Sequence, residues 1–171
     1  MRYYIAFPFL LAVALVQSSA LFSLPILRVK PDLMLLAVVG WGMSMGVKEA
    51  LIWGVVGGML LDLLGGAPLG VSVLSITPVA LLSGVGETKV VESNLPLALV
   101  VIFLGTLLYD SLFLLLMQLL GNHVEWWGSF VTLFLPTALL NTLLMPFAYW
   151  LFRWLGRRAR PSGFVELPKS G

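Results

Sequence analysis

The sequence has no cysteine and few charged residues. Of its 171 residues, 11% are Asp, Glu, Lys or Arg, whereas 60% are hydrophobic. The missing cysteines exclude disulfides, thiol catalysis and thiolate metal sites, and they leave the redox compartment undetermined. The mean hydropathy of +1.02 is too high for a soluble globular domain. The composition therefore predicts an integral membrane protein without a sizeable soluble domain.

Residues suited to catalysis are also scarce. His123 is the only histidine, and it lies beside Glu125 in an expected loop, where an interfacial polar residue is common. The sequence contains no H-E-x-x-H motif, no phosphate-binding Walker loop and no dinucleotide-binding fingerprint. No serine–histidine or serine–lysine pair is expected at a matching depth. We therefore predict that the protein is not an enzyme and that it has no cofactor and no metal site.

Six apolar segments are the dominant pattern, and a bilayer crossing takes about 20 residues. They predict an all-α polytopic membrane protein, with one six-helix domain over residues 1–160 and a flexible cytoplasmic tail over residues 161–171. The first segment also resembles a signal peptide, with Ser18-Ser19-Ala20 as a cleavage site, but its length favours a retained helix. The predicted helices are residues 4–26, 32–47, 49–65, 69–86, 95–120 and 129–155.

Lysine and arginine residues indicate the orientation. With both termini in the cytoplasm, eight of them lie inside, and only Arg28 and Lys30 lie outside. Four arginines between Arg153 and Arg160 follow the last apolar segment, where such a cluster fixes topology and contacts anionic lipid. No base-stacking groups interleave with them, so we predict no nucleic-acid binding. The count therefore predicts a multi-pass membrane protein with both termini in the cytoplasm.

The stretch GVVGGMLLDLLGGAPLG, residues 54–70, combines three features. Gly54, Gly57 and Gly58 leave a shallow groove that lets a second helix approach closely in lipid. Placing an ionisable side chain in lipid costs about 3 kcal/mol at the bilayer centre and less near its edges. Asp62 should therefore face protein or water. The Gly-Gly-Ala-Pro run that follows cannot continue the helix. The chain is therefore expected to turn back there.

A second Gly-x-x-x-Gly occurs at Gly42 and Gly46 in the preceding helix. Since small residues at this spacing favour close helix packing in membranes, we expect residues 32–47 and 49–65 to pack as a hairpin. Lys48 and Glu49 are the expected turn between them.

Polar residues gather toward the outer half of the predicted bundle. Asp32 begins the second helix, Asp62 is near the outer end of the third, and Asp110 and Asn141 lie deeper. They could converge on a pocket open to the outside, with Arg28 or Lys30 as a partner. Alternatively, Asp62 and Asp110 only fix packing and Asp32 only starts a helix. The candidate partner- or ligand-binding residues are Asp32, Gly54, Gly57, Gly58, Asp62, Gly70, Asp110 and Asn141.

Three motifs resemble the bacterial rod shape-determining protein MreD family. They are K-P-D-L at 30–33, G-x-x-G-G-M-L-L-D-L-L at 54–64 and P-L-G at 68–70. The resemblance implies a non-catalytic inner-membrane scaffold of the cell-elongation machinery, or elongasome. Such a scaffold binds the bitopic periplasmic protein MreC and helps regulate peptidoglycan synthesis and rod shape. Indirect partners would be MreB filaments, the elongation transpeptidase and the SEDS glycosyltransferase, and membrane lipid would surround the helices.

The same family is similar in size and helix number to the substrate-binding subunits of energy-coupling-factor vitamin transporters. That similarity implies an alternative function as a substrate-binding membrane subunit. Such a subunit is expected to carry Ala-x-x-x-Ala on its first helix, whereas this sequence has Ala14-x-x-x-Ser18. The departure favours the scaffold. An intramembrane enzyme is a third and weaker alternative.

Overall fold

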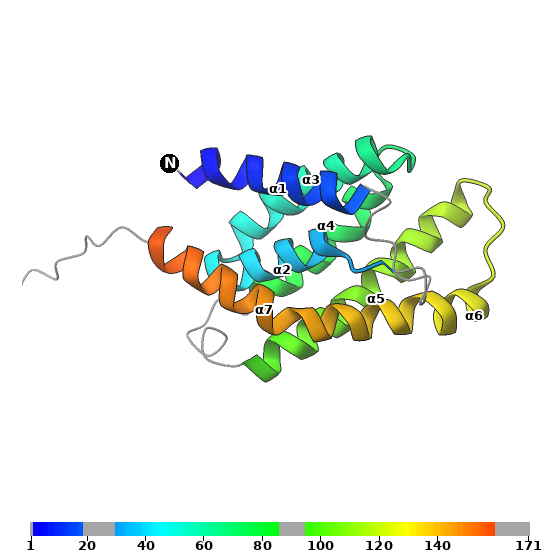
Figure 1. The fold of residues 1–171 in the computed structure, drawn as a ribbon. Helices are drawn as coiled ribbons and strands as arrows, with labels where there is room; N and C mark the ends of the chain where they lie inside the picture. The colour runs from blue at the N-terminus through cyan, green and yellow to red at the C-terminus, as the bar shows by residue number, and fades with distance from the viewer. Residues whose placement is uncertain (1, 19–29, 86–94, 160–171) are drawn as a thin grey trace, which may run out of the picture.

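Helices are the only regular secondary structure in the described part of the chain. The computed structural model describes residues 2–18, 30–85 and 95–159, and no strand occurs among them (Figure 1). The all-α fold class is therefore confirmed for these residues. The elements are α1 (Arg2–Ser18), α2 (Leu33–Met45), α3 (Val47–Gly65), α4 (Val71–Val85), α5 (Leu95–Leu119), α6 (Trp126–Ser129), the π-helix η2 (Phe130–Phe134) and α7 (Leu135–Ala159).

Some expected features lie outside the described residues. They are the end of the first predicted helix at 19–26, the position of Arg28, the loop after residue 86 and the tail at 161–171. Within the described ranges, the last helical run starts earlier than expected. It begins at Trp126 and passes through η2 into α7 without a gap.

The π-helix lies just before a proline. The Leu135 N–H donates to the carbonyl oxygen of Phe130, five residues back, and Pro136 has no N–H to donate. Local widening of a helix is one way in which a membrane helix accommodates proline. The run from Trp126 to Ala159 can thus stay helical across this point.

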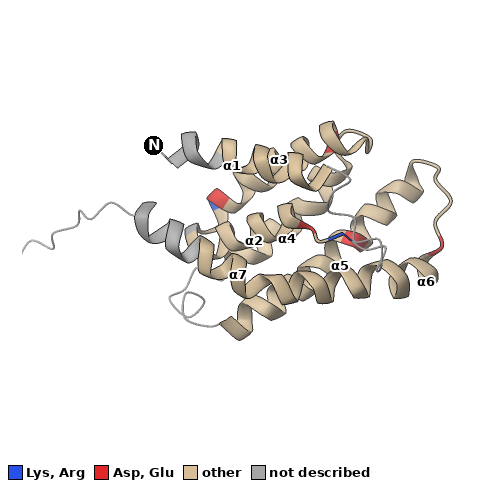
Figure 2. Ribbon diagram, in the orientation of Figure 1, with Lys and Arg blue, Asp and Glu red and all other residues tan. Residues whose placement is uncertain are grey.

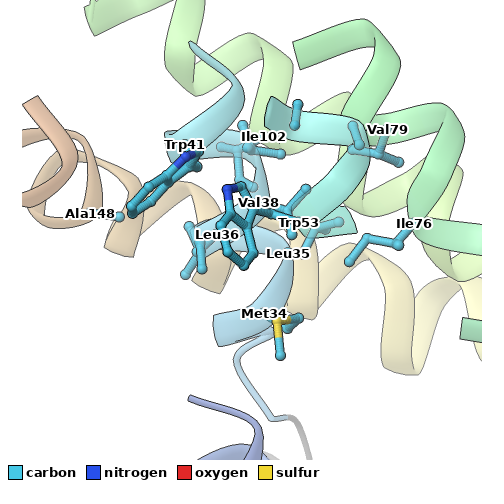
Figure 3. Close-up of a cluster of buried hydrophobic side chains, with 14 of the residues drawn as sticks. Met34, Leu35, Leu36, Val38, Trp41, Trp53, Ile76, Val79, Ile102 and Ala148 are labelled. Carbon is cyan, nitrogen blue, oxygen red and sulfur yellow. The ribbon is translucent and has the colours of Figure 1, made fainter. Parts of the chain in front are cut away.

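α2 is the core helix of the molecule. Every residue from Met34 to Met43 is buried, and α2 contacts α1, α3, α4, α5 and α7. Figure 1 shows it between α1 and α7. In Figure 3, α2 side chains including Val38 and Trp41 meet Trp53 of α3 and Ile102 of α5. A helix that is apolar on all sides needs such complete enclosure by protein or lipid.

A single glycine joins α2 to α3. Gly46 has φ of 93°, a conformation that glycine adopts without strain. Its N–H donates to Gly42 O at 2.8 Å, and its carbonyl oxygen accepts from Ala50 N–H at 3.0 Å. The expected turn at Lys48 and Glu49 is therefore wrong, because both residues already belong to α3. Gly46 is therefore the residue at which the chain turns from α2 into α3.

The glycines of α3 allow close contacts within the chain. A Cβ at Gly58 would lie 2.6 Å from Val73 Cα of α4, and one at Gly57 would lie 2.7 Å from Met34 Sδ of α2. A Cβ at Gly54 would lie 3.0 Å from Ala80 Cβ of α4. The α3 glycines thus allow close helix packing, and they do so against two helices, α2 and α4. The expected close packing of α2 against α3 is present, since Gly42 of α2 lies against Ala50 and Gly57 of α3 lies against Met34.

The outer surface of the bundle is apolar. Leu95–Leu119 and Trp126–Leu151 are long and apolar enough to cross a membrane, and Phe7–Ser18, Leu33–Ser44 and Val71–Gly84 are shorter apolar helices. Acidic and basic positions are few on the described ribbon (Figure 2). Exposed leucines and aromatics instead occupy the outward faces of several helices, among them Leu74, Leu104, Leu143 and Phe147. Such a surface suits contact with acyl chains.

We expect Gly58→Ala to destabilise the fold by about 1–3 kcal/mol, because the new methyl group would press on the α4 backbone. Gly65→Ala is the matched control, since a Cβ there meets nothing within 4 Å. Thermal unfolding of the purified protein in detergent measures both. Equal melting temperatures for the two variants would contradict the close α3–α4 contact.

Candidate functional site

Asp62, near the end of α3, forms hydrogen bonds with the beginning of α4. Its Oδ2 accepts the Gly70 N–H at 2.7 Å, and its Oδ1 accepts the Ser72 N–H at 2.9 Å. The first N–H groups of a helix have no partner within the helix, and the positive end of the helix dipole favours a carboxylate. The Asp62 side chain is only 3% exposed. The carboxylate therefore satisfies one buried donor, the Ser72 N–H, and one partly buried donor, the Gly70 N–H.

These bonds shape the α3–α4 turn, residues 66–70. Gly66 and Gly70 have φ values of 74° and 96°, which glycine tolerates best. Leu69, at the tip of the turn, is 76% exposed. A buried acidic group thus holds a turn that displays an apolar side chain at one end of the bundle.

Asp32 caps the beginning of α2. Its Oδ1 accepts the Leu35 N–H at 2.9 Å and the Gln17 Nε2–H at 3.0 Å. Gln17 Oε1 in turn accepts the Met34 N–H at 2.8 Å. Two side chains therefore satisfy the first donors of α2. Of the two interpretations of Asp32 left open by the sequence, the structure supports the helix-start role.

Asn141 connects this helix start to two long helices. Its Oδ1 accepts the Asp32 N–H at 2.9 Å, and its Nδ2 donates to Thr106 Oγ1 at 3.1 Å. Thr106 Oγ1 donates to Ile102 O at 2.8 Å. Asn141 and Thr106 are both fully buried. The network therefore ties α1, α2, α5 and α7 together at one level of the bundle.

A cavity of about 530 Å³ opens beside these helix ends. Its polar lining includes Lys30, Asp32, Ser72, Tyr109, Asp110 and Thr137. Apolar side chains, among them Leu61 and Phe113, complete the wall. Figure 2 shows one basic and two acidic segments close together near the labels of α4 and α5. The volume falls in the range of about 300–1,000 Å³ that is usual for small-ligand sites.

Asp110 lines the cavity and has a buried oxygen without a hydrogen bond. Its Oδ2 is buried and has no hydrogen-bond partner among the described residues. Buried polar atoms in proteins nearly always have a partner, and an unsatisfied one commonly marks an absent water, ion or ligand. Asp110 thus differs from Asp62, whose two oxygens both accept hydrogen bonds.

The structure brings together part of the predicted polar cluster. Asp32 and Asp110 line the cavity with Lys30, and Asn141 binds Asp32 from α7. Asp62 instead accepts hydrogen bonds from the N–H groups of Gly70 and Ser72 at the start of α4. Of these three residues, Ser72 lines the cavity. The predicted site residues Gly54, Gly57 and Gly58 are buried in contacts with α2 and α4, so we assign them to internal packing.

Sequence reasoning missed two residues of the polar network. Gln17 supports the start of α2 from α1, and Thr106 supports Asn141 from α5. Gln17 is a single amide in an otherwise apolar run, which is a usable signal in a membrane helix. Thr106 carries no such signal, because threonine commonly bonds a carbonyl of its own helix.

Helices with apolar outer faces and a polar interior at one end define the class: an α-helical membrane protein. The family model of the rod shape-determining protein MreD matches residues 1–158, which is nearly the whole chain. The chain therefore belongs to the MreD family, as its motifs indicate. Neither a curated protein sequence nor a solved structure matches it significantly.

Asp62→Ala should leave the buried Ser72 N–H and the partly buried Gly70 N–H without an acceptor, at a cost of about 1–3 kcal/mol. We expect a lower melting temperature and faster proteolysis in the α3–α4 turn. Asp62→Asn should lose less, since its amide oxygen still accepts one bond. Glu125→Ala is the control, because Glu125 precedes α6 without a side-chain capping bond. If Asp62→Ala and Glu125→Ala had the same melting temperature and the same rate of proteolysis, the stabilising role of the Asp62 hydrogen bonds would be refuted.

Asn141→Ala should destabilise the fold by about 1–3 kcal/mol, because the buried Asp32 N–H loses its acceptor. Thr142→Ala is the neighbouring control, since Thr142 Oγ1 bonds only Ala138 O of its own helix. Adding Thr106→Val to Asn141→Ala should cost less than the sum of the single changes, because the two side chains share one bond. Thermal unfolding in detergent measures the single and double variants. If the destabilisations by Asn141→Ala and Thr106→Val simply added, the hydrogen bond between these two side chains would be contradicted.

Proposed function

We propose that this chain is a non-catalytic scaffold of the bacterial cell-elongation machinery, with six transmembrane helices and both termini in the cytoplasm. Membership of the MreD family supports the shape-determining role. The distribution of lysine and arginine supports the orientation, since eight of ten lie on the cytoplasmic side in this arrangement. The end of the bundle that carries Lys30 and the α3–α4 turn then faces outward.

The scaffold would bind a bitopic, periplasmic MreC-like protein. By holding that partner at a fixed depth and orientation, it would position the partner's periplasmic part to regulate peptidoglycan synthesis. MreB filaments, the elongation transpeptidase and the SEDS glycosyltransferase would be reached through the partner. No bond is made or broken in this mechanism, so its requirement is a rigid contact surface.

The α3–α4 turn is the observation that supports such a surface. Asp62 holds the turn by two hydrogen bonds, and Leu69 extends from it with 76% of its surface exposed. An apolar side chain on a pre-organised turn loses little conformational entropy when it binds. Asp32 and Asn141 support the surface indirectly, because they fix the neighbouring start of α2.

The alternative function, a substrate-binding subunit of a vitamin transporter, draws support from the cavity. Against it stand the family assignment and the Ala14-x-x-x-Ser18 departure. Co-purification with a pair of ATPases, and not with a coiled-coil periplasmic protein, would favour the transporter.

We expect Leu69→Ala to lower recovery of the MreC-like partner about tenfold, as loss of an anchor side chain that contributes about 1.4 kcal/mol would. Leu143→Ala on α7 is a matched control, since Leu143 is also 76% exposed. Cell width should change with Leu69→Ala alone. The measurement is co-purification of both full-length proteins in mild detergent. Unchanged recovery, or equal loss with both variants, would exclude the turn as the contact.

A further inference from the structure

The cavity beside Asp110 combines opposite charges with apolar walls. Lys30, Asp32 and Asp110 are the charged side chains among its described lining residues. The Oδ1 atom of Asp32 already accepts two hydrogen bonds, from Leu35 and Gln17. The buried Oδ2 atom of Asp110 accepts none, so Lys30 is not its donor. A cationic donor is the chemistry that Asp110 lacks.

Lys30 supplies the complementary half of such a site. It is exposed, and it lies just before the buried Pro31 and Asp32 at the start of α2. A lysine ammonium at a membrane surface attracts anionic head groups. The lining of the cavity therefore includes both a carboxylate for a cation and an ammonium for an anion.

The apolar lining continues from the cavity to the outer surface of the bundle. Leu64 and Leu133 both line the cavity and are 39% and 44% exposed. They connect the charged interior with the surface that faces acyl chains. An occupant with a zwitterionic end and an apolar end matches this arrangement better than a wholly polar solute does.

We propose that this cavity binds the head group of a zwitterionic aminophospholipid, with its primary ammonium at Asp110 and its phosphate at Lys30. The cavity lies at the end of the bundle where α1 and α3 end and α2 and α4 begin, which is the level of the head groups in the proposed topology. The inference rests on that membrane placement and not on capture of a protein partner.

The experiment uses the purified full chain reconstituted with equal amounts of phosphatidylethanolamine, phosphatidylcholine and phosphatidylglycerol. Lipid retained after extraction in mild detergent is quantified by mass spectrometry. Phosphatidylcholine keeps the phosphate but has no N–H donor, and phosphatidylglycerol has no cation. We expect about tenfold preferential retention of phosphatidylethanolamine, equivalent to about 1.4 kcal/mol.

Two variants and one control connect the preference to the site. Asp110→Asn, which is nearly isosteric, should abolish the preference for phosphatidylethanolamine over phosphatidylcholine. Lys30→Gln should lower retention of all three lipids, because each carries the phosphate. Glu125→Gln removes a carboxylate that is exposed and outside the cavity, and it should change nothing. Melting temperatures of all variants verify that each is folded.

Equal retention of the three lipids by the unmodified protein would overturn the proposal. So would a preference that persists in Asp110→Asn. If Asp110→Asn instead releases the MreC-like partner and leaves lipid retention unchanged, the cavity receives a basic protein side chain and the lipid assignment is wrong. The MreC-like partner could bind neither the unmodified protein nor any variant, while the unmodified protein still prefers phosphatidylethanolamine. In that case only the proposed scaffold function is refuted.

Discussion

The structure depends on satisfying the backbone N–H groups at helix starts that water does not reach. α2 begins at a buried Asp32 and α4 begins beside a buried Asp62. An unpaired N–H in an apolar surrounding costs several kcal/mol. Side-chain oxygens from Asp32, Gln17 and Asn141 serve the start of α2. Both oxygens of Asp62 serve the start of α4. Short helices can therefore begin inside the protein.

The same arrangement explains why polar and charged residues concentrate at one end. Four helix ends meet there, and each needs donors or acceptors that lipid cannot provide. Most of the polar side chains at this end form hydrogen bonds with backbone groups, so their role is structural. Asp110 differs, because its Oδ2 has no such partner. Asp110 thus lacks the backbone hydrogen bonds that Asp32 and Asp62 make, and this difference is the basis of the proposed lipid site.

Glycine has two distinct uses in this chain. In α3, Gly57 and Gly58 remove side-chain volume so that α2 and α4 can pack on both sides. At Gly46 and Gly70, a positive φ lets the chain change direction within a few residues. Sequence spacing alone does not distinguish these uses, since Gly42 and Gly46 have the spacing of a packing seam, yet Gly42 lies against Ala50 and Ser83 whereas Gly46 adopts a positive φ at the turn.

The sequence by itself determined the membrane class, the helical elements, the break after α3 and the need for Asp62 to face protein. These follow from composition and from local patterns of a few residues. Only the tertiary structure decided which donors Asp62 and Asn141 bind, which helices the α3 glycines contact, and that Lys30 and Asp110 share a cavity. The reason is physical: membrane helices are apolar on every face, so periodicity does not show which face meets which neighbour. Packing of the whole bundle selects those pairs.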